Sequence, residues 1–117
     1  MNDPARESVW LALSELWLDT ELDAADLAAI AGTLAISGLT VEELEAIYRL
    51  EVAPVVWGNA WVTAGVWDGF DPDWLFEACR RNQQRRRSPW HRLRCRVLRR
   101  AMTYATEAHW RAIRAQL

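Results

Sequence analysis

Signals that open helices recur along the whole chain, and they constrain its fold more than any other feature. A capping side chain directly before proline occurs three times, at Asp3-Pro4, Asp71-Pro72 and Ser88-Pro89. Proline suits the first helical position because its missing N–H has no partner there in any case. Asp23 is a further cap, and Thr40-to-Glu43 has the spacing of a capping box. The chain is therefore predicted to consist of consecutive helices.

Apolar residues recur three and four positions apart in these helices, which gives each of them an apolar face. The first face comprises Val9, Ala12, Leu13, Leu16 and Trp17. The last helix is expected to begin at Pro89 and to continue toward the C-terminus. Its inward stripe is predicted to comprise Trp90, Leu93, Val97, Ala101, Tyr104 or Ala105, Ala108 and Ala112. Its arginines are expected on the opposite side.

The segment from Val55 to Val62 is apolar on nearly all sides, which predicts a buried helix at the centre of the fold. Its β-branched residues would also suit a strand, but the sequence offers no second strand for pairing. Pro54, just before it, fits either a kink or a new helix start. We therefore predict an all-α protein in which residues 1–117 form a single compact domain of roughly five or six helices, ending in a long Arg-rich helix.

The charged residues are strongly segregated along the chain. The acidic part, residues 1–77, contains two arginines and fifteen Asp or Glu, a formal charge of −13. The basic helical part, residues 78–117, contains twelve arginines and one acid, Glu107, a formal charge of +11. Lysine is absent. Segregation of this size bears on binding partners rather than on the fold.

The sequence carries no motif for catalysis or cofactor binding. It has no Gly-x-Ser-x-Gly elbow and no phosphate-binding glycine loop. His91 and Cys95 are four residues apart on one helix face, but Cys79 and His109 do not complete a known metal-ligand spacing. We therefore expect neither a metal nor a cofactor.

The composition predicts a cytoplasmic protein. The first residues lack the basic start and apolar run of a secretory signal. No apolar run reaches the roughly 18 residues of a membrane span. Cys79 and Cys95 are expected to be free thiols in a reducing compartment.

The Arg-rich segment permits three interpretations. Its arginines could contact nucleic-acid phosphates, neutralise the acidic helices within the molecule, or face an acidic protein partner. The candidate nucleic-acid contacts are Arg85, Arg86, Arg87, Arg92, Arg96, Arg99 and Arg100. The overall acidity, with a pI near 5.7, argues against a plain nucleic-acid-binding protein.

The acidic residues of the first three helices form a second candidate surface, the acidic pole. Such a surface would steer basic partners toward it. Its members are Glu15, Asp19, Glu21, Asp23, Asp26, Glu42, Glu43 and Glu45. Several of them also occupy cap or first-turn positions, where a negative charge favours the helix dipole.

Three segments resemble a family of small bacterial proteins known only as a domain of unknown function. They are residues 9–21 (VWLALSELWLDTE), residues 43–48 with 51–55 (ELEAIY and EVAPV), and Asn59 with residues 64–71 (AGVWDGFD) and 74–75. The resemblance covers about residues 5–78 and implies no activity, catalytic residue or cofactor. Small families of this kind often lie beside secreted-toxin genes, so the resemblance implies, by association only, a toxin as partner.

We therefore predict a non-enzymatic protein-binding protein. The specific hypothesis is an immunity-type inhibitor that neutralises a cognate bacterial toxin by covering its active site. The acidic pole is the expected contact, because many toxic effectors are nucleases with basic clefts. The alternative is a nucleic-acid-binding regulator that uses the Arg-rich helices, and a third class is an enzyme with carboxylates near Asp19, Glu51 and Asp68. The long C-terminal helix would also suit a homodimer.

Overall fold

The computed structural model describes residues 4–18, 22–57, 72–104 and 106–117, and every regular element in these residues is helical. The elements are α1 (Pro4–Leu18), α2 (Ala24–Ile36), α3 (Val41–Ala46), the π-helix η1 (Ile47–Val52), α5 (Pro72–Arg85), α6 (Pro89–Thr103) and α7 (Glu107–Arg114). The predicted all-α fold is confirmed. Helices α3 and η1 are parts of one continuous helix, Val41–Trp57, which we call the central helix.

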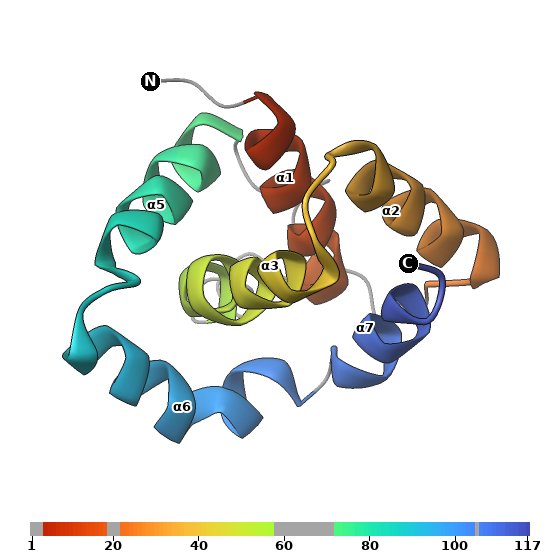
Figure 1. The fold of residues 1–117 in the computed structure, drawn as a ribbon. Coiled ribbons are helices and arrows are strands. Elements are labelled where there is room, and N and C mark those ends of the chain that lie inside the picture. The colour runs from red at the N-terminus through yellow and green to blue at the C-terminus, as the bar shows by residue number, and fades with distance from the viewer. Residues whose placement is uncertain (1–3, 19–21, 58–71, 105) are drawn as a thin grey trace.

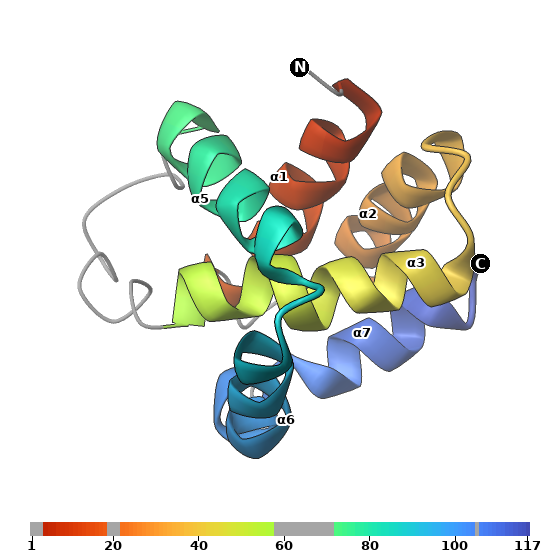
Figure 2. The same cartoon turned by 60° about the vertical axis from the view of Figure 1, so that its left-hand side comes forward.

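The central helix lies in the middle of the molecule, and the other helices surround it (Figures 1 and 2). Its η1 turns contact α1, α5 and α6, while α2 packs on α1 and α7. The buried core residues that it contributes are Leu44, Ile47, Tyr48, Val52, Val55 and Val56. The predicted buried helix is found for residues 55–57, but it begins at Val41 and not at Val55. Residues 58–62 lie outside the described part of the chain.

Pro54 explains why the central helix contains a π-helical stretch. In an α-helix the N–H four residues after Leu50 would belong to Pro54, which has none, and the proline ring would clash with the Leu50 carbonyl. The chain widens instead, and Ala53 N–H bonds the Tyr48 carbonyl five residues earlier. His91 Nε2 donates to the freed Leu50 carbonyl at 2.9 Å. Pro54 thus neither breaks the helix nor starts a new one.

Two of the predicted helix caps form, whereas Ser88 precedes Pro89 at the start of α6 without a capping hydrogen bond from its side chain. Asp23 and Asp26 form a reciprocal capping box at α2. Thr40 accepts the Glu43 N–H at 3.1 Å, as predicted for α3. The reciprocal half of that box is not made, because the Glu43 carboxylate bonds arginine side chains instead.

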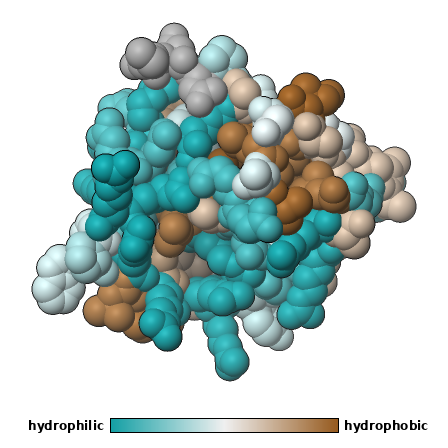
Figure 3. Space-filling model, viewed as in Figure 1, coloured by the Kyte–Doolittle hydropathy of each residue, from teal (hydrophilic) through white to brown (hydrophobic). Residues whose placement is uncertain are grey.

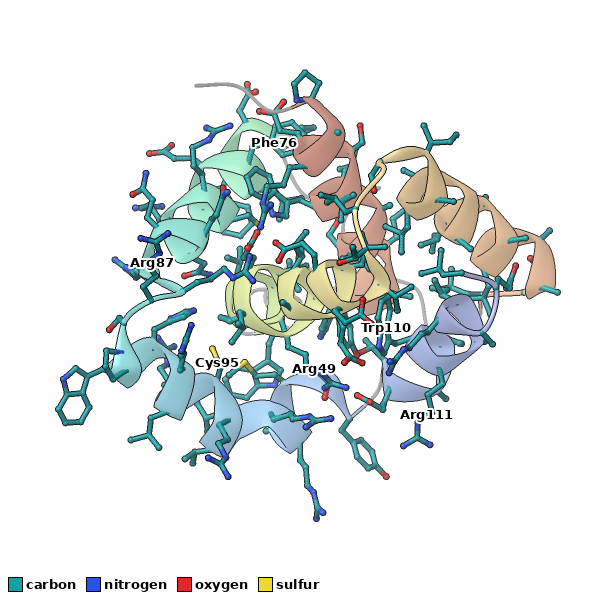
Figure 4. All side chains as sticks on the ribbon, in the orientation of Figure 1. Arg49, Phe76, Arg87, Cys95, Trp110 and Arg111 are labelled. Carbon is teal, nitrogen blue, oxygen red and sulfur yellow. The ribbon has the colours of Figure 1, made fainter. Side chains whose placement is uncertain are left out.

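The prediction of a single long C-terminal helix is wrong in detail, because the chain changes direction at a corner between α6 and α7. Thr106 N–H bonds the Thr103 carbonyl at 3.0 Å, and the Thr106 hydroxyl bonds it as well at 3.2 Å. The Tyr48 hydroxyl lies 2.6 Å from the Thr106 hydroxyl and fixes the corner to the central helix. The turn directs α7 so that Trp110 and Ile113 are buried in the core (Figure 4).

The rotation of α6 about its axis is also opposite to the prediction. Its buried residues are His91, Cys95, Met102 and Thr103. Two side chain–backbone bonds fix this rotation: His91 to the Leu50 carbonyl, and Trp17 Nε1 to the Met102 carbonyl at 2.8 Å. Figure 4 shows Cys95 on the side of α6 that faces the central helix. The part of the predicted inward stripe that runs from Trp90 to Tyr104 therefore faces solvent.

Candidate functional site

Four large exposed apolar side chains lie on the outer face of α6 and at its C-cap residue, Tyr104, and we call them the outer stripe. Their exposed fractions are 80% for Trp90, 51% for Leu93, 71% for Val97 and 87% for Tyr104. Single exposed apolar residues are ordinary, but a row of them on one helix is typical of a binding surface. In Figure 3 a hydrophobic patch bordered by hydrophilic side chains lies at the lower left, where α6 runs in Figure 1.

Arginines border the outer stripe. All five arginines of α6 are exposed: Arg92, Arg94, Arg96, Arg99 and Arg100. Within the described residues, none of them forms an ion pair with a carboxylate. Arg92 Nε donates to the Arg86 carbonyl at 2.7 Å. A row of apolar and aromatic side chains between exposed guanidinium groups combines the residue types that dominate binding energy at interfaces.

The corner between α6 and α7 forms a concave surface that includes the end of the stripe, because Val97 and Tyr104 are among its lining residues. Its volume is about 950 Å³, and its lining includes Arg96, Arg99, Arg100, Arg111 and Tyr104. Glu107 is the one carboxylate in the lining, and it already accepts Arg49 Nη2 at 3.0 Å. The concave surface is therefore basic, with an exposed aromatic ring beside it.

A buried carboxylate joins α1, η1 and α5 on the other side of the central helix. Glu51 is fully buried. One of its oxygens accepts Arg6 Nε at 3.1 Å and Trp10 Nε1 at 2.8 Å. The other accepts Arg6 Nη2 at 2.6 Å and Arg86 Nη1 at 3.0 Å. Glu43 bonds the same two arginines at 2.8 and 2.6 Å, which completes the buried ion cluster of Arg6, Glu43, Glu51 and Arg86.

The buried ion cluster has the geometry of a structural site. Each Glu51 oxygen already has two donors, so neither is free to take a proton from a substrate. Asp19 and Asp68, the other members of the predicted carboxylate group, lie outside the described residues. The cluster instead holds α1 and the end of α5 against η1.

His91 and Cys95 also lack the arrangement of a nucleophilic pair. The Cys95 sulfur lies 3.6 Å from His91 Nε2, but that nitrogen carries its proton toward the Leu50 carbonyl. A protonated nitrogen cannot accept the thiol proton, and burial raises the pKa of Cys95. In the described part of the chain, no group of three or more His, Cys, Asp or Glu could hold a metal ion.

Much of the acidic pole is occupied within the molecule. Glu43 belongs to the buried ion cluster, and Glu45 bonds Trp110 Nε1 at 3.2 Å and Arg114 at 3.1 Å. Asp23 and Asp26 are exposed but bond each other's backbone. Glu15 and Glu42 are exposed, and Asp19 and Glu21 lie outside the described residues.

The basic part accordingly divides into two groups. Arg80, Arg86 and Arg114 form ion pairs with carboxylates of the acidic part, namely Glu7, Glu43 with Glu51, and Glu45. Internal neutralisation thus accounts for these three. The predicted nucleic-acid contacts Arg85, Arg87, Arg92, Arg96, Arg99 and Arg100 are exposed, whereas Arg86 is half-buried in the ion cluster.

Stability is expected to fall at acid pH because of Glu43. Its bonds to Arg86, and secondarily to Arg6, lower its pKa from 4.5 to about 2. A depressed folded-state pKa contributes stability above pH 4.5 that is lost as the pH falls toward 2. Urea titrations at pH 7, 4.5 and 2.5 should show a loss of about 2–3 kcal/mol from this group. In the Glu43→Gln variant the free energy of unfolding should change less between pH 4.5 and pH 2.5. An unchanged wild-type stability down to pH 2.5 would contradict the lowered pKa of Glu43.

Helical periodicity predicts the wrong side for the outer stripe because α6 has two apolar faces. One contains the outer stripe and the other contains His91, Cys95, Leu98 and Met102 at spacings of three and four. Periodicity alone does not choose between two such faces. The choice is made by a non-local contact, in which His91 binds the Leu50 carbonyl that Pro54 leaves free.

Comparison with known proteins gives one match. A family model described as "Domain of unknown function (DUF7079)" matches residues 4–116, well beyond the segments noted in the sequence. No curated protein and no solved structure matches the chain. Among the described helices, none is by itself long and apolar enough to cross a membrane; only α2 and the central helix taken together pass by length and composition, and they are bent by 117°.

Proposed function

The chain belongs to the family described as Domain of unknown function (DUF7079), and we propose that it is a protein-binding protein whose contact surface is the outer stripe of α6. The observation that carries the proposal is the exposure of Trp90, Val97 and Tyr104 on a helix whose other face is fixed in the core. A fold that buries His91 in place of Trp90 leaves an apolar face of α6 exposed, where another molecule could bind.

The charge beside the stripe indicates an acidic partner. The arginines of α6 form no ion pair with carboxylates of the described residues, whereas Arg80, Arg86 and Arg114 do. Complementary charge would speed association and fix the register of the bound partner. An acidic protein surface with apolar side chains at its centre fits this face.

The acidic pole is less well suited as the main contact. Glu43 and Glu45 would have to leave Arg86 and Arg114 to face a partner. An immunity-type inhibitor remains a specific form of the proposal, with α6 rather than the acidic pole covering the toxin. The exposed carboxylates Glu15 and Glu42 would then contribute steering alone.

Nucleic acid is the second candidate ligand, and the concave surface between α6 and α7 is the observation in its favour. Several arginines and the exposed Tyr104 line one hollow. Proteins that bind single strands combine a basic groove with aromatic rings on which bases stack. Binding of this kind would weaken steeply with salt.

A capture experiment with surface variants tests the proposal. Tagged wild-type protein, Trp90→Ala and Val97→Asp are incubated with nuclease-treated extract of the source organism. The two variants should retain at least about tenfold less of any stoichiometric protein partner, since central aromatic and apolar contacts dominate binding energy. Ile36→Ala is the matched control, because Ile36 is 87% exposed on α2, across the molecule from α6 (Figure 1).

Three outcomes are informative. Loss of the partner in the α6 variants alone supports the proposal. Equal retention by all variants contradicts it. Loss of all ligand on nuclease treatment, with recovery of bound DNA or RNA from untreated extract, would transfer the function to the concave basic surface.

A further inference from the structure

We infer that the outer stripe of α6 receives an acidic amphipathic helix, which pairs with α6 as in a short coiled coil. This inference rests on the proposed function and names the class of partner element. It starts from the spacing of the exposed residues rather than from their number. The alternatives are a second copy of this chain and a nucleic acid.

The outer stripe follows a heptad repeat. With Trp90 at position a, Leu93 falls at d, Val97 at the next a, and Tyr104 at the a after that. The f positions of the same repeat are Cys95 and Met102, both buried in the protein's own core. The f position lies opposite the a/d seam, so the seam faces away from the core, and its end at Val97, Arg100 and Tyr104 lines the concave surface beside α7. Over its 15 residues, α6 offers a seam about 22 Å long.

The position that breaks the seam identifies the charge of the partner. The second d position is Arg100, exposed and without a carboxylate partner in the described residues. A helix seated on the seam would cover this guanidinium. A charge covered in this way needs a carboxylate opposite it. Arg94 and Arg96 occupy the flanking e and g positions, where charged residues set the choice of partner.

A second copy of α6 does not meet this requirement. In a parallel pair of α6 helices, Arg100 of one copy would face Arg100 of the other. In an antiparallel pair the e positions would lie beside each other, and so would the g positions, so that arginines approach arginines. Like charges at such positions oppose pairing. A helix with leucine-like residues at its seam and glutamate or aspartate at its flanks satisfies both the apolar stripe and the arginines.

Two model peptides test the inference on the intact protein. Both are stapled 21-mer helices with leucine at the seam; one carries glutamate at the flanks and opposite Arg100, and the other carries lysine. Fluorescence anisotropy should show at least about tenfold tighter binding of the glutamate peptide. Arg94→Glu with Arg96→Glu and Arg100→Glu in one variant should reverse the preference. The three arginines are exposed, and circular dichroism verifies that the variant is folded.

Equal binding of both peptides, no binding of either at 1 mM, or no reversal in the charge-swap variant would each overturn helix pairing. Self-association of the wild-type protein in sedimentation, lost in Val97→Asp, would assign the seam to a second copy instead. Capture of a partner that depends on Trp90 and Val97 would still support the proposed function in those cases. Failure of capture in all α6 variants would remove the proposed function itself.

Discussion

Replacement of Glu51 by glutamine is expected to lower the free energy of unfolding by about 3–5 kcal/mol, the usual effect of removing one partner from a buried ion pair. Glutamine keeps the shape of the side chain but replaces one acceptor oxygen with an NH₂ group. That group would face the N–H donors of Arg6 and Arg86, and the guanidinium of Arg6 would lose its buried counter-charge. Urea denaturation at pH 7 measures the change.

A more exposed ion pair provides the control for this experiment. Glu7 accepts Arg80 Nη2 at 2.7 Å, but both side chains are partly solvated. Glu7→Gln is expected to cost about 1 kcal/mol or less, as is usual for pairs near the surface. If Glu51→Gln costs no more than Glu7→Gln, the buried ion cluster does not hold α1 and α5 to the central helix.

Trp110→Ala is expected to have a similarly large effect on stability, about 3–5 kcal/mol, because it leaves a cavity in the core. The indole is 1% exposed and stacks on Tyr48, with ring centroids 4.9 Å apart. Its Nε1 also donates to Glu45. Figure 4 shows Trp110 between α7 and the central helix, so its loss should detach α7 first.

Trp90→Ala is the matched variant of the same residue type. Trp90 is 80% exposed, so its removal should change the free energy of unfolding by no more than about 0.5 kcal/mol. Thermal and urea unfolding of both tryptophan variants give the comparison. A loss for Trp90→Ala as large as that for Trp110→Ala would place Trp90 in the core and restore the inward stripe that periodicity alone predicts.

The sequence predicts the helices well because their signals are local. Pro4, Pro72 and Pro89 each stand as the first residue of a helix. Gly38 follows α2 with a φ of 77°, the left-handed conformation that glycine commonly adopts just after a helix. Capping and proline effects depend on residues within one turn, so tertiary contacts seldom override them.

The features that the sequence does not predict depend on contacts between distant residues. The corner before α7 requires Tyr48 to meet Thr106, and the rotation of α6 requires His91 to meet Leu50. The ion cluster places Arg6 beside Glu51, although both belong to the acidic part and neither stood out as the other's partner. Helical periodicity carries no information about which of two apolar faces finds the core.

The candidate site follows from these non-local contacts. Its residues are recognisable in the sequence as a stripe of apolar side chains among arginines, but their direction is not. The same stripe is a core element if it points inward and a partner surface if it points outward. Only two contacts between distant residues, His91 with the Leu50 carbonyl and Trp17 with the Met102 carbonyl, decide between the two.

Site-specific photo-crosslinking tests the central claim, that the outer face of α6 binds an acidic helical partner, most directly. A benzophenone amino acid is placed at position 97 in the outer stripe, or at position 36 on α2 as the control, and irradiated in the source organism. We predict one crosslinked protein species at position 97 and none at position 36, with the crosslinked peptide mapping to an acidic amphipathic helix. The same products at both positions, or no product at position 97, would contradict the account.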